Sequence, residues 1–342
     1  MQYCYFFLVN FSYKISLFLI IILFFIFNES YSQQGNLGSY YFFNDFSDTK
    51  TSAMGFTSVS NPFSPISHKT NPALLTFDQD LNLYGSSFGD EFIASVSSKL
   101  FGLAFAVDYS IIDYSRNFFI PEYGPIDYND SFYSFNVSKK ITRDFSLGTS
   151  ITFLDLLNDF SYKINFGAVY RIENLLESSD VHNDLFLGFA LNNLGPDLTD
   201  GRNEIYLPIY IDIGATYRIE SGENSLFSYS LETSIKYKNY LNPGTFSDYS
   251  FPSPSWDEAK YRDFWGLGFE VTLFKMISLR DGYYKSPYMD NFIHTGGIGI
   301  YFPPRVTKFS ISIEYMRFWD RRYYFGNGRA YSTSLNLSYL LN

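Results

Sequence analysis

Apolar and polar residues alternate one by one along much of the chain. In 145–153 the odd-numbered positions are mostly Phe, Leu and Ile, while the even-numbered positions are Ser, Gly and Thr. The segments 226–238 and 330–341 alternate in the same way. Because successive side chains of a β-strand point to opposite faces, this pattern predicts strands with one apolar and one polar face.

Segments of this kind occur fourteen times after residue 80. A strand that crosses a bilayer needs about 9–11 residues, which is close to the length of most of them. The even number is the one found in bacterial outer-membrane barrels. We expect strands at 81–88, 91–99, 102–113, 131–141, 145–156, 160–172, 184–194, 209–220, 226–238, 263–274, 276–285, 292–303, 309–319 and 330–341.

The connections between these segments differ in length with a regular parity. If the chain starts in the periplasm, the odd-numbered connections face outward, and the long ones, 114–130, 195–208, 239–262 and 320–329, are all odd-numbered. The even-numbered ones are short turns, except 173–183. Long outer loops and short inner turns predict an all-β fold, a transmembrane antiparallel β-barrel of about 14 strands over residues 81–342. The alternative is a secreted all-β protein whose apolar faces form one core.

The first 32 residues have the features of an export signal. Lys14 precedes an apolar run over 15–27, and the small residues Ser30 and Ser32 follow it. This order is typical of a cleaved signal peptide, so we expect residues 1–32 to be removed and the protein to reach the bacterial outer membrane. An uncleaved anchor is the alternative. Residues 33–80 are rich in Gly, Asn, Pro and Ser, and we expect this N-terminal segment to form a plug or hatch in the lumen.

The composition agrees with a wall that faces lipid on one side only. The 342 residues are 46% hydrophobic and 21% aromatic but only 18% charged, and the mean hydropathy is still -0.09. A net charge of -10 argues against a nucleic-acid partner, which needs clustered Lys and Arg. With one cysteine, Cys4, and three scattered histidines, we expect no metal and no cofactor. No catalytic motif is present, so we expect no enzymatic activity.

Several charged residues fall on the polar face of the expected strands, where they would line the lumen. A charge that faced lipid would cost about 2–4 kcal/mol near the bilayer centre. Opposite charges in a narrow lumen can pair, which favours a structural network that fills the barrel; the alternative is a lining that guides a substrate. The residues of this predicted lumen network are Asp212, Arg218, Glu232, Lys236, Glu270, Arg280 and Glu314.

Five short motifs along the chain resemble those of one family. The first two, Thr51–Phe56 (TSAMGF) and Asn71-Pro72-Ala73-Leu74-Leu75, are similar to the A-x-A-M-G-G and N-P-A-G-L opening of the PorV/PorQ family. That family belongs to the FadL-like group of fourteen-stranded outer-membrane barrels. The other three are 192–196 (NNLGP), 207–217 with Leu-Pro and Gly-Ala-Thr-Tyr, and 268–283 with Gly-Phe-Glu and Leu-Arg-Asp-Gly-Tyr. Together they cover nearly the whole chain after the signal peptide.

The resemblance implies two alternative functions. Members similar to PorV and PorQ serve the type IX secretion system and bind exported or surface proteins without doing chemistry. This is the function that we predict, with secreted cargo proteins or other secretion-system components as partners, beside outer-membrane lipid. FadL-like relatives instead pass hydrophobic small molecules such as fatty acids, and a hatch that would contain Asn71, Pro72 and Ala73 helps to gate the route.

Two of the expected outer loops carry aromatic residues that suit a protein interface. Tyr and Trp are enriched at the energetic centres of such interfaces, and prolines restrict loop 239–262. The alternative is that these rings fold over the barrel mouth or reach into lipopolysaccharide. The predicted partner-binding residues are Tyr249, Phe251, Trp256, Tyr261, Arg321, Tyr323 and Tyr324.

Overall fold

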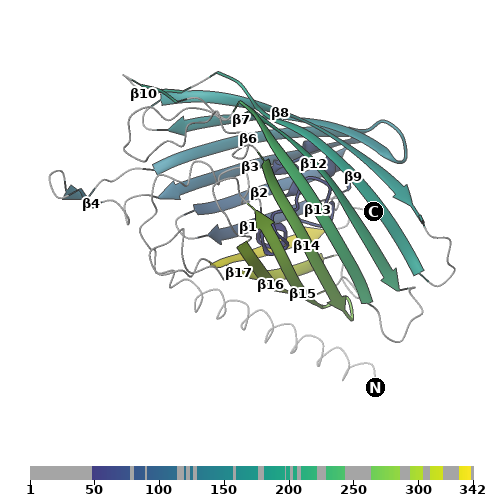
Figure 1. Ribbon diagram of the computed structural model, residues 1–342. Coiled ribbons are helices and arrows are strands. Elements are labelled where there is room, and N and C mark those ends of the chain that lie inside the picture. The colour runs from purple at the N-terminus through teal and green to yellow at the C-terminus, as the bar shows by residue number, and fades with distance from the viewer. Residues whose placement is uncertain are drawn as a thin grey trace, which may run out of the picture.

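The computed structural model is dominated by one closed sheet (Figure 1). It describes residues 48–77, 81–88, 91–113, 119–120, 124–125, 129–156, 159–175, 181–196, 198–200, 203–205, 209–221, 229–242, 263–285, 293–302, 309–318 and 331–339. The expected signal peptide lies outside these residues, as do 33–47 and 78–80 of the expected plug. The N-terminal division of the chain therefore stays a prediction.

Fourteen strands form the barrel, and each expected segment overlaps one of them, which confirms the predicted fold class. Two further pairs of short strands, β4 (Phe119–Ile120) with β5 (Gly124–Pro125) and β10 (Leu198–Asp200) with β11 (Asn203–Ile205), lie in connections that we expected to be loops. The barrel strands are β1 (Leu81–Phe88), β2 (Glu91–Leu100), β3 (Leu103–Asp113), β6 (Asn129–Lys140), β7 (Phe145–Leu156), β8 (Asp159–Glu173), β9 (Val181–Leu194), β12 (Ile209–Ser221), β13 (Tyr229–Asn242), β14 (Asp263–Leu273), β15 (Ile277–Lys285), β16 (Ile293–Phe302), β17 (Phe309–Phe318) and β18 (Tyr331–Tyr339).

Two strands run three or more residues beyond their predicted bounds. β13 continues to Asn242 instead of 238, because its last residues pair with the start of β12 across a register shift between Ile209 and Tyr210. β9 begins at Val181 instead of 184 and pairs there with Ser221. The added residues include Asn239, Asn242 and Asn183, and Asn favours turns locally. Pairing with a neighbouring strand satisfies their backbone hydrogen-bonding groups and extends the strands.

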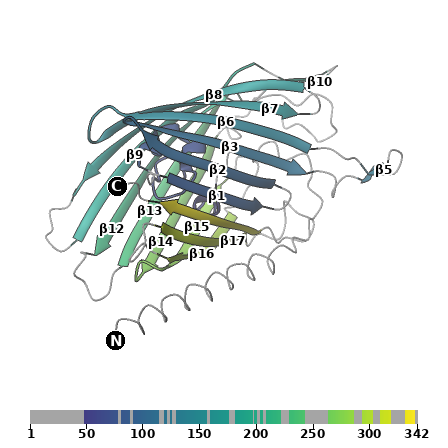
Figure 2. The ribbon, with the colours of Figure 1, turned by 180° about the vertical axis from the view of Figure 1, so that it is seen from behind.

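The barrel closes through its first and last strands. β1 pairs with β18 in an antiparallel register that runs from Leu81–Tyr339 to Phe88–Ser332. Figure 2 shows the sheet from behind, with β1, β2, β3 and β6 side by side. Closure leaves no unpaired sheet edge, which a bilayer requires because lipid offers no hydrogen bonds to a free backbone.

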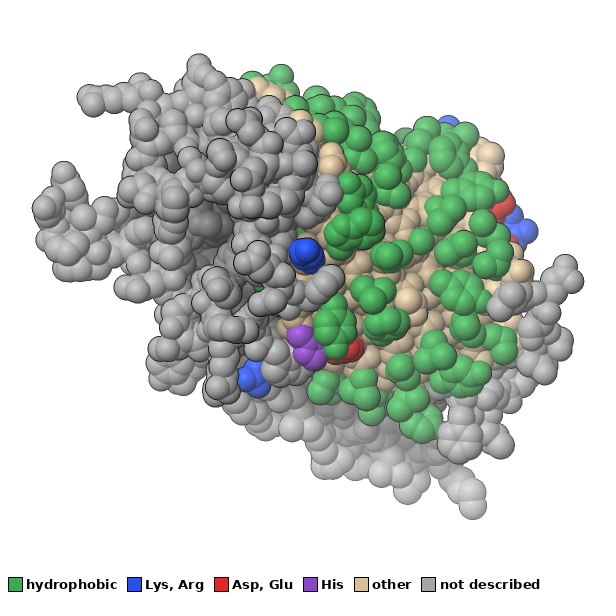
Figure 3. Space-filling view, in the orientation of Figure 1, with side chains coloured by type: hydrophobic (Ala, Val, Ile, Leu, Met, Phe, Trp, Pro, Cys, Tyr) green, Lys and Arg blue, Asp and Glu red, His purple; other side chains and the backbone are tan. Residues whose placement is uncertain are grey.

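The two faces of the wall have opposite chemistry. On β6, Tyr133 and Phe135 are 46% and 50% exposed, whereas the intervening Ser134 and the following Asn136 are buried. Large apolar side chains are exposed on strand after strand, and on the face seen in Figure 3 they are spread over the described part of the wall. A closed sheet with an apolar outside and a polar inside is a transmembrane barrel. The protein is an outer-membrane β-barrel.

Three short turns lie at one end of the barrel, which we call the inner end. They join β2 to β3, β6 to β7 and β14 to β15. The longer connections, among them 243–262, leave from the opposite, outer end. By the general rule for such barrels, the inner end faces the periplasm.

Residues 48–77, the inner segment, lie inside the barrel. The segment begins with α3 (Thr49–Ala53), whose first turn is capped by Asp48: the side chain accepts a hydrogen bond from the Thr51 backbone N–H at 2.8 Å. This helix packs against β15 to β18. Two 3-10 turns follow, η1 (Ser67–Lys69) and η2 (Pro72–Phe77), and η2 packs against β3, β6, β7 and β8. Among the described residues, no helix is long and apolar enough to cross a membrane.

Candidate functional site in the barrel lumen

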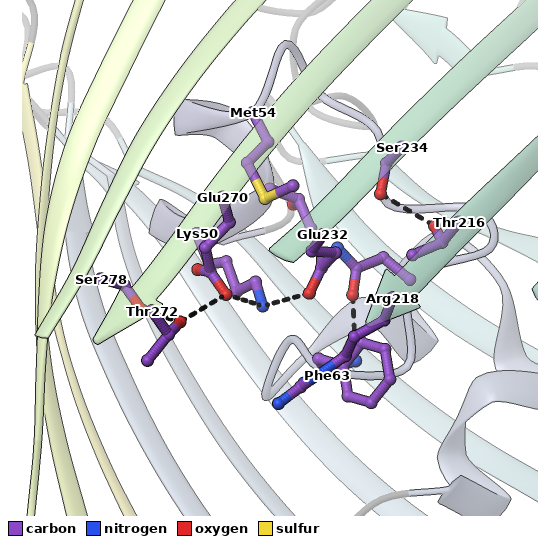
Figure 4. A network of polar contacts seen from close by, with 12 residues as sticks. Lys50, Met54, Phe63, Thr216, Arg218, Glu232, Ser234, Glu270, Thr272 and Ser278 are labelled. Carbon is purple, nitrogen blue, oxygen red and sulfur yellow. Dashed lines mark hydrogen bonds and ion pairs between the residues drawn. The ribbon is translucent and has the colours of Figure 1, made fainter. Parts of the chain in front are cut away.

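A buried lysine of the inner segment joins two strands of the wall (Figure 4). Lys50 Nζ donates to Glu232 Oε2 on β13 at 3.0 Å and to Glu270 Oε1 on β14 at 3.1 Å. These two carboxylates stand directly opposite each other in the strand register, an arrangement in which like charges repel. Lys50 supplies the positive charge that holds them together away from water.

The charged network continues along the wall. Arg280 on β15 is the cross-strand neighbour of Glu270 and donates to its Oε2 through Nε at 2.5 Å. The Nη2 of Arg280 donates to Glu314 Oε1 at 3.1 Å, and Tyr301 donates to the same oxygen at 3.0 Å. Buried charges are tolerated when they are paired and hydrogen-bonded. The network therefore fixes the inner segment and several strands in one arrangement.

The side chains of the other three predicted lumen residues make different contacts. Asp212 and Lys236 approach each other on β12 and β13, with 3.6 Å between Oδ2 and Nζ. Arg218 on β12 stands opposite Glu232 in the strand register, but its side chain contacts Glu220 and its guanidinium sits 4.0 Å from the centre of the Phe63 ring. The structure thus brings together four of the seven residues, Glu232, Glu270, Arg280 and Glu314. That any of them guides a substrate stays a prediction.

Two members of the network come from residues that strand patterns do not reveal. Lys50 and Asn61 both belong to the inner segment, and Asn61 Nδ2 donates to Glu232 Oε1 at 2.5 Å. Alternation assigns a side chain to a face of a strand, but it does not show which side chain of a non-strand segment meets that face. The available signal is indirect: carboxylates on the polar face of neighbouring strands require a cation from elsewhere.

The predicted hatch motif lies against the wall. Asn71 Nδ2 donates to the Val59 carbonyl at 2.7 Å and to the Ala168 carbonyl of β8 at 3.2 Å, while its Oδ1 accepts from the Ala73 backbone N–H at 3.1 Å. Pro72 then begins η2. The motif joins the inner segment to β8, and its gating role stays a prediction.

Glycines let the backbone of the inner segment touch the sheet. A Cβ built on Gly268 would lie 2.5 Å from Met54 Cβ, and one built on Gly148 would lie 2.5 Å from the Ala73 nitrogen. Real side chains do not approach so closely, so these positions need glycine. A Cβ would meet the inner segment in the same way at Gly167, Gly188, Gly214, Gly266, Gly282 and Gly297. The wall is therefore shaped for this segment from β7 to β16.

An aromatic group lies toward the outer end of the lumen. Phe56 of the inner segment packs edge-on against Tyr284, with ring centres 4.6 Å apart, and Tyr284 stacks with Phe264 at 5.5 Å. Lys238 Nζ sits 3.8 Å from the centre of the Tyr210 ring and 6.0 Å from that of Phe264. All of these side chains are buried.

A second aromatic group lies toward the inner end. Phe186 on β9 packs edge-on against Phe63 at 5.5 Å and against Phe77 at 5.4 Å. Under these rings is a buried apolar cluster that includes Leu74 and Val169. Phe63 and Phe77 are only half-buried, so apolar surface is available inside the barrel.

The predicted partner-binding residues of loops 239–262 and 320–329 lie outside the described residues. Their role stays a prediction. Within the part of the chain that the structure describes, no group of three or more His, Cys, Asp or Glu side chains could hold a metal ion.

Comparisons with known proteins give matches in structure but none in sequence. No protein-family model matches the chain, and no curated protein matches it. The toluene transporter TbuX of Ralstonia pickettii is similar in structure, at 10% identity over 88% of this chain and 100% of that chain, with a TM-score of 0.45. A FadL homologue of Pseudomonas aeruginosa matches at 10% identity over 86% and 98%, with a TM-score of 0.40.

The CymD monoaromatic hydrocarbon channel is a third such structure, at 11% identity over 86% of this chain and 97% of that chain, with a TM-score of 0.41. Because these TM-scores are all below 0.5, the assignment of the fold rests on the strand pairing of the chain itself. The resemblance to the PorV/PorQ family is not shown by any of these comparisons and stays a prediction.

Proposed function

We propose that the protein transports small hydrophobic molecules across the outer membrane through its lumen. The supporting observation is the half-buried aromatic surface of Phe63 and Phe77 on Phe186 at the inner end. The faces of these rings that stay exposed are apolar surface in the lumen, and sites for small apolar molecules are lined by aromatic side chains with a few polar groups.

The inner segment would control this route. It contributes Phe56 to the outer aromatic group and Phe63 and Phe77 to the inner one. Between them, Lys50 and its partners hold the segment against the wall. Passage therefore requires part of the segment to move.

A second candidate is the secretion role, which the five motifs that resemble the PorV/PorQ family favour. In that role the outer loops bind exported proteins and the lumen carries no substrate. The loops concerned are 239–262 and 320–329.

Uptake by liposomes tests the transport proposal. Liposomes that contain the protein should take up naphthalene and palmitate faster than liposomes without protein. The double variant Phe63→Ser, Phe77→Ser removes the aromatic surface and should lower uptake about tenfold, the equivalent of 1.4 kcal/mol. The matched control Phe63→Leu, Phe77→Leu keeps the surface apolar and should retain most of the uptake.

No uptake by the wild-type protein would contradict transport. Affinity purification of the tagged protein from outer membranes of its host, with mass spectrometry, then tests the secretion role. Recovery of exported proteins with a shared C-terminal domain, lost when 243–262 is deleted, would support secretion. Recovery of the barrel alone, with bound fatty acid or another lipophile, would contradict it.

A further inference from the structure

Two turns at the inner end place a phenylalanine where neither the backbone nor burial favours one. Phe101, between β2 and β3, has φ +53° and is 101% exposed. Phe274, between β14 and β15, has φ +56° and is 47% exposed. Bulky residues rarely adopt positive φ, and Asn or Gly is usual in such turns. Strain of this kind is a reason to look for a function.

Each ring has exposed apolar neighbours. Leu100 precedes Phe101 and is 52% exposed, and Ile141, in the turn after β6, is 53% exposed. Because β3 pairs with both β2 and β6, these two turns lie next to each other. Met276 accompanies Phe274 and is 36% exposed. The apolar outer face of the barrel thus continues into the turns.

Each ring also has an exposed lysine beside it. Lys139, at the end of β6, stands opposite Leu103, the residue that closes the Phe101 turn. Lys275 directly follows Phe274 and is itself at positive φ, +55°. Both lysines are exposed. The chain as a whole carries a net charge of -10, so the charge beside both strained rings is opposite in sign to the net charge of the protein.

We propose that the Phe101 and Phe274 turns bind the headgroups of anionic phospholipids in the inner leaflet of the outer membrane. The ring and its apolar neighbours lie at the level where acyl chains meet headgroups, and the lysine reaches the phosphate. One ring with one lysine is far smaller than the roughly 800 Å² per partner of a stable protein interface. A single lipid headgroup matches this size and charge.

The amount of anionic lipid that the protein retains tests the two proposed sites. The full barrel is reconstituted with phosphatidylcholine and phosphatidylglycerol in equal amounts and extracted in a mild detergent. Native mass spectrometry then measures how much of each lipid stays bound. Lys139→Gln and Lys275→Gln should each lower phosphatidylglycerol retention about fivefold, the effect of one basic group near an anionic surface. Arg143→Gln is the matched control: its side chain is 77% exposed at the same end but paired with Glu173, so the variant should retain lipid like the wild type.

Phe101→Asn separates lipid binding from a role in folding. Asn tolerates positive φ, so the variant should unfold in neutral detergent at a temperature no lower than the wild type, yet retain less phosphatidylglycerol. Unchanged retention in both lysine variants would overturn the proposal. An equal loss in Arg143→Gln would overturn it too, because it would show a response to overall charge and no defined site.

Discussion

The two parts of the inner segment are held to the wall in different ways. The first part, 48–61, is tied by charge, through Lys50 and Asn61 to Glu232. The second part, 66–77, is held by the amide of Asn71, by apolar packing of η2, and by a contact of 2.9 Å between His68 and Asp108. Removing one partner of a buried ion pair leaves the other charge buried and uncompensated, whereas the stabilisation from apolar contacts falls gradually with the area that is exposed. The second part has one buried contact of this kind, His68 with Asp108, whereas Lys50 joins two carboxylates in the first part. We infer that the second part shifts more easily than the first.

Among the variants considered, Lys50→Met is expected to lower the stability of the protein most. Glu232 and Glu270 would remain buried and opposite each other without their shared cation, which should lower the free energy of unfolding by about 3–5 kcal/mol. Urea unfolding in detergent micelles, followed by tryptophan fluorescence, measures the loss.

The double variant Lys50→Met, Glu232→Gln removes the cation together with one carboxylate. The amide oxygen introduced by Glu232→Gln would still accept the hydrogen bond from Asn61, so part of the lost stability should return. A double variant as unstable as Lys50→Met alone would show that charge pairing is not what holds the first part.

Replacing one glycine beside each part by alanine should destabilise the protein less than Lys50→Met and allows the two parts to be compared directly. Gly268→Ala pushes a methyl group against Met54 in the first part, and Gly148→Ala pushes one against Ala73 in the second. Overpacking costs about 1–3 kcal/mol, and we expect Gly268→Ala to lie at the upper end because the first part cannot give way. Gly85→Ala is the control, since its Cβ would lie 4.0 Å from the nearest atom.

Cysteine labelling reports which part moves in these variants. The chain has one cysteine, Cys4, so Ser52→Cys or Ser67→Cys in a chain without it marks each part separately. Gly148→Ala should raise labelling at 67 and leave 52 protected. Equal labelling at both positions would contradict a division of the segment into two parts.

Lys140→Gln should have the smallest effect. Its Nζ lies 4.6 Å from the centre of the Phe77 ring, and a cation–π contact of a partly exposed group is worth about 0.5–1 kcal/mol. The same urea titration measures it. A loss as large as that of Lys50→Met would mean that the second part also depends on charge.

The strands of the barrel were largely predictable because their causes are local. Period-two alternation follows from the geometry of a strand in a wall with lipid outside and polar groups inside. The extension of β13 was not predictable, since it depends on pairing with β12 across a register shift. The short pairs β4–β5 and β10–β11 were missed for a different reason, because strands of two or three residues are too short to show alternation.

The lumen site was only half predictable. Alternation assigned Glu232, Glu270, Arg280 and Glu314 to the polar face, and the strand register brings them together. Lys50 could not be found in this way, because its position depends on how a segment without strands lies inside the closed wall. The wall glycines are a signal that was available: eight of them lie where the inner segment touches the sheet.

The seam between β1 and β18 has a consequence for the order of assembly. The inner segment precedes β1 in the chain, yet it lies enclosed by a wall whose last strand is the C-terminal one. The enclosure is complete only when Leu81 and Tyr339, at opposite ends of the folded chain, come together. We infer that the sheet closes around the segment: an open sheet can receive the segment before β1 pairs with β18, whereas a closed barrel would have to admit it through one end.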